Sequence, residues 1–190
     1  MAALAYSEFD IIKNFLATSD LSFLRDGVEL GIGDDAAIIK PPRDQNLVVS
    51  LDVLASGVHF PSDAEPDVIA RRALGVNLSD LAAMAADPLC FTLGLSIPEI
   101  SEDWIQQFAD GLSTLARRFN CPLVGGDLSL GPLQIAIQVH GLVPLDQAML
   151  RSGARIGDSI LVTGTLGDAA VALLGLGYQS HLESGLELLG

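Results

Sequence analysis

The residues best suited to chemistry are aspartates beside small residues at the ends of apolar segments. Asp34 and Asp35 lie in GIGDDAAII, Asp52 ends LVVSLD, Asp127 follows PLVGG, and Asp80 lies in VNLSDLAAM on a predicted helix. Carboxylates held close together repel one another unless cations lie between them. Mg²⁺ prefers oxygen ligands and commonly bridges carboxylates to substrate phosphates. If these aspartates converge on one cleft, they predict a site for several Mg²⁺ ions and a nucleoside triphosphate.

Each of these positions also has a simpler interpretation. A single aspartate can occupy a solvated turn, because acids are frequent in turns. Within the Asp34–Asp35 pair, one carboxylate can bind backbone N–H groups of its own turn instead of a metal ion. Gly125 and Gly126 would let a ligand approach the backbone closely before Asp127, and a plain turn is the alternative there.

Other nucleotide-binding and catalytic motifs are missing from the sequence. Neither of the two lysines, Lys13 and Lys40, lies in a GxxxxGK[ST] pattern, which excludes a P-loop. Gly31 and Gly33 lack the third glycine and the preceding strand of a dinucleotide fingerprint. No Ser-His-Asp arrangement is present, and two cysteines with three histidines make neither a disulfide framework nor a zinc site.

Composition limits the partners. Of the 190 residues, 49% are apolar and only 5% aromatic, and 10 basic against 24 acidic side chains give a net charge of −14. Such a charge argues against nucleic acid as a partner, because phosphate backbones are bound by clustered Lys and Arg. No apolar run reaches the roughly 18 residues that span a bilayer, and MAALAYSEFD does not read as a signal peptide. We therefore expect no membrane partner and a cytoplasmic location. The mean hydropathy of +0.44 points to a large buried interface such as that of a dimer.

Hydrophobic periodicity predicts a mixed order of helices and strands, and hence an α/β or α+β fold. We expect a first domain over residues 1–145 and the beginning of a second, incomplete domain over 146–190. The predicted helices are one beginning at Ser7, 66–86, 101–119 and a run from Gly167 through Leu174, and the predicted strands are 35–40, 47–53, 89–97, 122–124, 133–143 and 159–164.

Five segments together carry a family resemblance. GIGDDAAII, SLDVLASGVHF, ALGVNLSDLAAMAADP, LVGGDLS and MLRSGARIGDSILVTGTLGDAA occur in this order and at a spacing that resembles the thiamine-monophosphate kinase family. That family shares a superfamily with aminoimidazole ribonucleotide synthetase and selenophosphate synthetase. The resemblance runs from about Ser7 to about Leu174, and Ala85 stands where the family commonly has Gly.

The resemblance implies a set of magnesium ligands. Leu51 replaces a residue that is usually Thr in the family, so only its backbone carbonyl could serve as a ligand. The positions that match the family's metal contacts are Asp35, Ser50, Leu51, Asp52, Asp80 and Asp127.

It also implies contacts to the two substrates. His59, in SGVHF, matches a position that contacts thiamine phosphate, with a satisfied loop histidine as the alternative. Gly126 and Asp127 match the turn that binds ATP phosphates. Arg151, in LRSGA, matches an arginine on the ATP phosphates, with a plain surface arginine as the alternative.

The fold and chemistry implied by the resemblance are those of an aminoimidazole ribonucleotide synthetase-like domain. Its four-stranded sheet, flanked by helices, would pair with that of a second copy in a homodimer. The reaction would be direct transfer of the γ-phosphoryl group of ATP to thiamine monophosphate, giving thiamine diphosphate and ADP in thiamine diphosphate biosynthesis. Catalysis would consist of positioning and of charge neutralisation by several Mg²⁺ ions, without a covalent enzyme intermediate or a dedicated general base.

Two other functions stay open. Family members carry a complete second domain, whereas this chain ends at Gly190. We therefore expect the chain alone to dimerise and to bind Mg-nucleotide weakly, with little or no kinase activity. The alternatives are a non-catalytic, dimeric nucleotide-binding fragment and a sibling ATP-dependent synthetase acting on a purine precursor. SGVHF and the missing glycine-rich loop of selenium enzymes argue against the sibling enzyme.

Overall fold

The computed structural model describes residues 8–18, 20–162 and 166–167. The chain divides into two compact units, residues 1–148 and 149–190. The second unit contributes one described element, a 3-10 helix at Arg151–Gly153. All the other elements belong to the first unit. The assignment of a function to each part stays a prediction.

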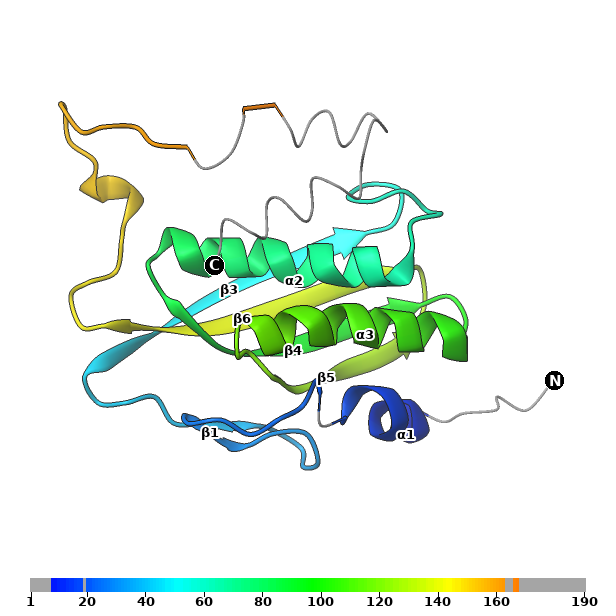
Figure 1. Ribbon diagram of the computed structural model, residues 1–190. Coiled ribbons are helices and arrows are strands. Elements are labelled where there is room, and N and C mark those ends of the chain that lie inside the picture. Colours follow the sequence, from blue (N-terminus) through cyan, green and yellow to red (C-terminus); the bar gives the residue numbers. More distant parts are fainter. Residues whose placement is uncertain (1–7, 19, 163–165, 168–190) are drawn as a thin grey trace. The chain divides into compact units, whose positions relative to one another are not determined.

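A four-stranded sheet forms the centre of the first unit. Its strands are β3 (Gln45–Ala55), β4 (Asp87–Ile97), β5 (Leu123–Leu130) and β6 (Gln134–Pro144). Their order is β3-β6-β4-β5, in which β4 and β5 are parallel and the other neighbours are antiparallel. Two helices, α2 (Pro66–Ala83) and α3 (Glu102–Arg118), lie across the sheet (Figure 1). This arrangement confirms the expected mixed α/β fold.

Local signals explain where the two helices begin. The Ser101 hydroxyl accepts a hydrogen bond from the Trp104 backbone N–H (3.4 Å) and caps α3, whose first turn is acidic and whose last turn is basic. Pro66 occupies the first turn of α2, where its missing N–H costs nothing. The helices approach closely at Gly111, where a Cβ atom would lie 2.5 Å from the Asp67 carbonyl oxygen.

Strand register assigns side chains to the two faces of the sheet. Ser50 and Asp52 pair with Val139 and Ile137, which are fully buried in the core. Because successive side chains point to opposite faces, Leu51 and its neighbours project from the other side. We call this side the open face and define it by the exposed β3 residues Leu47, Val49, Leu51 and Val53.

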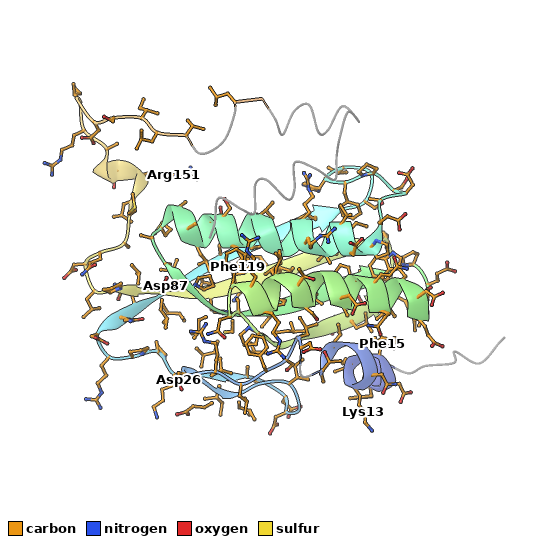
Figure 2. All side chains as sticks on the ribbon, viewed as in Figure 1. Lys13, Phe15, Asp26, Asp87, Phe119 and Arg151 are labelled. Carbon is orange, nitrogen blue, oxygen red and sulfur yellow. The ribbon has the colours of Figure 1, made fainter. Side chains whose placement is uncertain are left out.

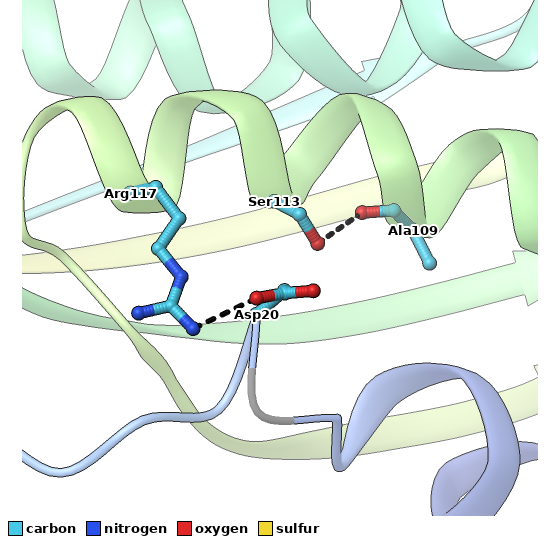
Figure 3. Close-up of polar contacts among 4 residues, drawn as sticks. All are labelled: Asp20, Ala109, Ser113 and Arg117. Atoms are coloured by element: carbon cyan, nitrogen blue, oxygen red, sulfur yellow. Dashed lines mark hydrogen bonds and ion pairs between the residues drawn. The ribbon is translucent and has the colours of Figure 1, made fainter.

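The N-terminal segment packs against this framework. Its elements are α1 (Glu8–Ile11), a π-helical turn (Ile12–Leu16), and a hairpin of β1 (Val28–Leu30) and β2 (Ile38–Ile39). Arg117 of α3 forms an ion pair with Asp20 (2.9 Å) near the Ser113–Ala109 hydrogen bond (Figure 3). Val28 packs in a buried cluster with Cys90 and Val124. These contacts tie the N-terminal segment to α3 and to β4 and β5.

The structure corrects three strand predictions. The strand expected at 35–40 is only Ile38–Ile39, which pairs with the unpredicted β1. The strand expected to end at residue 124 continues as β5 to Leu130, because it pairs with β4 as far as Ile97.

The strand expected at 159–164 is also wrong over its described part, residues 159–162. Ile160 and Leu161 are 93% and 90% exposed and have no partner strand in the described chain. An apolar run needs a neighbouring strand to form a sheet. The helical run expected from Gly167 through Leu174 lies almost entirely outside the described residues.

Candidate functional site

One group of predicted ligands meets where β3 runs beside α2. The Ser50 hydroxyl donates a hydrogen bond to Asp80 Oδ2 over 2.6 Å, within the usual range for an O–H···O bond. The Asp52 backbone N–H donates to Asn77 Oδ1 over 3.2 Å. We call Ser50, Asp52, Asn77 and Asp80 the β3–α2 seam. Asn77 was not among the residues predicted from the sequence. A polar residue one helical turn before Asp80, on the apolar face of the helix, could have pointed to it.

A second group lines a cavity beside β5. The cavity has a volume of about 660 Å³, within the range of small-molecule sites. Its polar rim includes Asp34, Asp35 and Asp127, and Phe9 and Leu16 contribute to its apolar wall. We call it the β5 pocket.

The two acids of the Asp34–Asp35 pair differ in their surroundings. Asp34 Oδ1 accepts a hydrogen bond from the Asp35 backbone N–H over 2.8 Å. Asp34 therefore stabilises its own turn, as one of the two was expected to do. The exposed Asp35 carboxylate is left as the better candidate for a cation.

The β5 pocket offers no positive side chain to a phosphate group. None of the described residues that line it is Lys or Arg. Lys13 is exposed and points away from the sheet (Figure 2). Lys40 forms an ion pair with Glu29 (2.7 Å), and this partner raises the pKa of Lys40. A phosphate bound here would need metal cations or a cation from elsewhere.

The seam and the pocket do not merge within one chain. They lie at opposite edges of the sheet, since β3 and β5 are three strand spacings apart, or about 14 Å. The two aspartates also lie on different faces of the sheet. Across the four strands, Asp127 is in register with Gly94, then Ala136 and then Val53. The Asp127 side chain is therefore on the same face as Val53, which is opposite to the face of Asp52. Among the described residues, no three His, Cys, Asp or Glu side chains gather around one possible metal position. The expected convergence of five aspartates on one cleft is therefore not found in the single chain.

The chemistry of both groups nevertheless fits Mg²⁺. The seam presents two carboxylates and a hydroxyl, and the pocket presents carboxylates from two segments. Oxygen donors of this kind are the ligands that Mg²⁺ takes, with bonds of about 2.0–2.1 Å. Because such bonds are short, one ion cannot join Asp52 and Asp127 of the same chain.

Three further predicted site residues are not part of the seam or of the lining of the β5 pocket, and one of them, Arg151, belongs to the second unit. The Leu51 side chain is 55% exposed on the open face, so only its backbone could contact a cation at the seam. His59 is exposed, and its Nδ1 accepts a hydrogen bond from the Ala55 N–H (3.0 Å), so the neutral ring carries its hydrogen on Nε2. Arg151 is exposed on the 3-10 helix of the second unit (Figure 2). Their roles stay predictions.

The surroundings of the two adjacent glycines of β5, Gly125 and Gly126, differ. A Cβ atom on Gly126 would lie 1.9 Å from the Leu93 carbonyl oxygen, so this position is required by the contact between β4 and β5. A Cβ atom on Gly125 would meet nothing within 4 Å, although Gly125 also lines the β5 pocket. Packing within the chain explains the glycine at position 126 but not the one at position 125. The close approach of a ligand to the backbone would explain Gly125.

Residues 33–143, which contain the seam and most of the described pocket, match one family model. Its description is "AIR synthase related protein, N-terminal domain". The chain belongs to this family. The match covers the whole four-stranded sheet up to Val143 and both covering helices.

Individual members of the AIR synthase related family give a narrower comparison. The chain is 46% identical over 170 residues to the thiamine-monophosphate kinase of Escherichia coli K12, covering 90% of this chain and 52% of the relative. It is 46% identical to the Synechococcus elongatus kinase over 149 residues, covering 77% of this chain and 45% of that relative. The resemblance to thiamine-monophosphate kinases is thereby confirmed. The chain spans about half the length of the curated relatives it matches.

Solved structures of the family agree with the fold. The thiamine-monophosphate kinase of Stenotrophomonas maltophilia K279a superposes with a TM-score of 0.75 at 46% identity, covering 87% of this chain and 56% of that chain. AaThiL complexed with AMPPCP and TMP superposes with a TM-score of 0.67 at 31% identity, covering 73% of this chain and 45% of that chain.

Proposed function

We propose that this chain supplies the Mg-ATP-binding part of a thiamine-monophosphate kinase. The observation that carries the proposal is the pairing of Ser50 with Asp80 at 2.6 Å, because it joins two predicted ligands from segments 30 residues apart. The similarity to kinases of this name, including one complexed with AMPPCP and TMP, supports ATP and thiamine monophosphate as the substrates.

The proposed reaction transfers the γ-phosphoryl group of ATP to a phosphate oxygen of thiamine monophosphate. The bond from the β–γ bridging oxygen to the γ-phosphorus breaks, a new P–O bond forms to the acceptor, and the products are ADP and thiamine diphosphate. Bound Mg²⁺ supplies positive charge that offsets the charge of the phosphates. Asp35, Asp127, Asp52, Asp80 and Ser50 would hold the cations, and Gly125 would let the nucleotide approach β5.

Substrate contacts outside the two acidic groups are part of the same proposal. His59 would donate from Nε2 to the phosphate of thiamine monophosphate, because Nδ1 already accepts the Ala55 N–H. Arg151 would contact the ATP phosphates with its planar guanidinium. Neither residue would take up a proton during the reaction, since a phosphate acceptor is already ionised at neutral pH.

A homodimer built on the open face is also part of the proposal. Val49, Leu51 and Val53 are each about half exposed on an edge strand, and a contiguous apolar patch of this kind commonly marks an interface. A second copy could cover this patch and bring further acids to each site. Light scattering of Val53→Glu should then show monomers, with Gln107→Glu on the outer surface of α3 as the matched control. A dimeric Val53→Glu variant would contradict this surface.

We further propose that the protein acts in the cytoplasm. Both cysteines are buried free thiols, as a reducing compartment allows. None of the helices in the described part of the chain combines the length and apolar character that crossing a bilayer requires.

Calorimetry of ATP binding tests the proposal. We expect the chain to bind ATP with Mg²⁺ present and not with EDTA. Asp127→Asn should weaken binding while the circular dichroism spectrum stays unchanged. Absence of Mg-dependent binding would remove the proposed function. A coupled ADP-release assay comparing thiamine monophosphate with formylglycinamidine ribonucleotide separates the kinase from a sibling synthetase. Mg-ATP binding without turnover of either acceptor would favour the non-catalytic fragment.

A further inference from the structure

Asn77 is a polar residue in a place that favours apolar ones. Its side chain is fully buried on α2, in a helix face shared with Ala73, Leu74, Leu78 and Leu81, all of which are 2% exposed or less. Asn is a weak helix former because its amide competes for backbone hydrogen bonds. A buried amide also loses its hydration, at a cost of about 1–3 kcal/mol if it stays unpaired. The position therefore calls for specific partners.

Both ends of the Asn77 amide have partners. Oδ1 accepts the Asp52 backbone N–H over 3.2 Å, and Nδ2 donates to the Ala73 carbonyl over 2.9 Å. The backbone N–H can only donate and the carbonyl can only accept, so the orientation of the amide is fixed. Asn77 is thereby anchored on its own helix and reaches across to one backbone position of β3.

That backbone position belongs to an edge strand. β3 has only β6 as a neighbour in the sheet. Asp52 is on the β6-facing register of β3, because Leu145 N–H donates to the Asp44 carbonyl and Ser56 N–H to the Leu133 carbonyl. The bond to Asn77 is therefore an additional link that comes from α2. It also fixes the position of β3 along the axis of α2 at Asp52, whose carboxylate is a predicted metal ligand.

A second link runs parallel to the first. The Ser50 hydroxyl bonds Asp80, which lies three residues after Asn77 on α2, while Ser50 lies two residues before Asp52 on β3. Three helical residues rise about 4.5 Å, and two strand residues about 6.6 Å. The two spacings are similar, so the links form neighbouring bridges between the same two elements.

We propose that Asn77 is a positioning residue that holds Asp52 of β3 in register with Asp80 of α2, so that their carboxylates are presented together to a Mg²⁺ ion. The inference rests on the proposed function. Asn77 does not touch the ion, since its side chain is fully buried and its Oδ1 is directed at the Asp52 backbone N–H. Partners of this kind, one step behind the ligands, typically change metal affinity by about 10–100-fold when removed.

The test is Mn²⁺ binding to the 190-residue chain in the presence of ATP, measured by electron paramagnetic resonance. Asn77→Ala and Asn77→Leu both remove the bridge, and Asn77→Leu keeps the side chain bulky. Each should weaken Mn²⁺ binding about tenfold or more. Leu74→Ala is the matched control, because Leu74 is fully buried one turn away and is apolar. It should lower the unfolding free energy and keep the Mn²⁺ affinity of the original chain.

The outcomes separate the two proposals. If the original chain binds no Mn²⁺ with ATP, the proposed function fails. If it binds and the folded Asn77 variants bind equally well, or if Leu74→Ala loses as much affinity as they do, the positioning role is overturned. Should neither Asn77 variant fold, nuclear magnetic resonance of the original chain decides. The Asn77 side-chain amide signal is expected to shift on addition of Mg-ATP, and an unmoved signal overturns the proposal.

Discussion

Ser50 on β3 and Asp80 on α2 share a hydrogen bond of 2.6 Å, although 30 residues separate them in the chain. The bond holds the Asp80 carboxylate against the strand that also carries Asp52. An exposed carboxylate on a helix would otherwise sample several rotamers, and fixing it in advance lowers the entropy lost when a cation binds. The seam is thus partly organised before any ligand arrives.

The Asp80 carboxylate should matter for the nucleotide and little for the fold. Asp80→Asn removes a negative charge from an exposed helix position, so we expect Mg-ATP to bind at least about tenfold more weakly. The unfolding free energy should change by no more than about 0.5 kcal/mol. Isothermal titration calorimetry and urea denaturation measure the two quantities. Asp110→Asn, at an exposed position of α3, is the control and should leave the affinity unchanged. Equal affinities in all three proteins would count against the seam as a cation site.

The glycine pair of β5 predicts two opposite results from the same substitution. Gly126→Ala places a methyl group against the Leu93 carbonyl, so it should destabilise the protein by more than about 1 kcal/mol. Gly125→Ala meets no atom of the chain. It should preserve stability and weaken ATP binding by crowding the β5 pocket. Thermal denaturation and calorimetry on both variants check this, and a destabilised Gly125→Ala protein would contradict it.

Ala85 occupies a backbone conformation that suits glycine. Its φ is +56°, and Ala86 N–H bonds the Leu81 carbonyl while Ala85 N–H bonds the Ala82 carbonyl, a Schellman ending of α2. α3 ends with the same pattern of bonds at Asn120, a residue type that tolerates this conformation better. Ala85→Gly should therefore stabilise the protein by about 0.5–1 kcal/mol. Ala83→Gly, inside the last turn of the same helix, should destabilise it by a similar amount. Urea denaturation of both variants decides, and the same sign for both would refute the prediction.

The burial of His140 makes the stability of the protein depend on pH. It is 8% exposed on β6, and burial lowers its pKa below the ordinary value of 6.5, with a backbone contact at Cys90 opposing this in part. Between the lowered pKa and 6.5 the unfolded chain binds more protons than the folded chain. The contribution of His140 is therefore complete above about pH 6.5 and is lost as the pH falls through that window. The decrease in unfolding free energy from pH 7 to pH 5.5 should be smaller in His140→Gln, as urea denaturation would show. An unchanged decrease would mean that other groups account for it.

Some features of this protein are readable from residue types and spacing. The capping serine and acidic first turn at 101–103 locate the start of α3, and alternation over 133–143 locates β6. Such signals are local, because a helix cap or a strand period involves neighbours in the sequence. The same holds for the acids in GIGDDAAII and NLSDLAAM, whose chemistry predicts a cation site wherever the fold places them.

Which of those acids lie together was decided only by the tertiary structure. Strand order set Asp52 and Asp127 three strand spacings apart, because β6 and β4 lie between β3 and β5. Pairing register set the two side chains on different faces of the sheet. Packing of α2 on β3 turned Asn77 from an ordinary helix residue into the partner of Asp52. Pairing with β4 also extended β5 past Gly126 to Leu130. Residues 159–162 have no strand beside them in the described chain and do not form a strand. Sequence patterns report local preference, whereas register and layer depend on contacts between segments far apart in the chain.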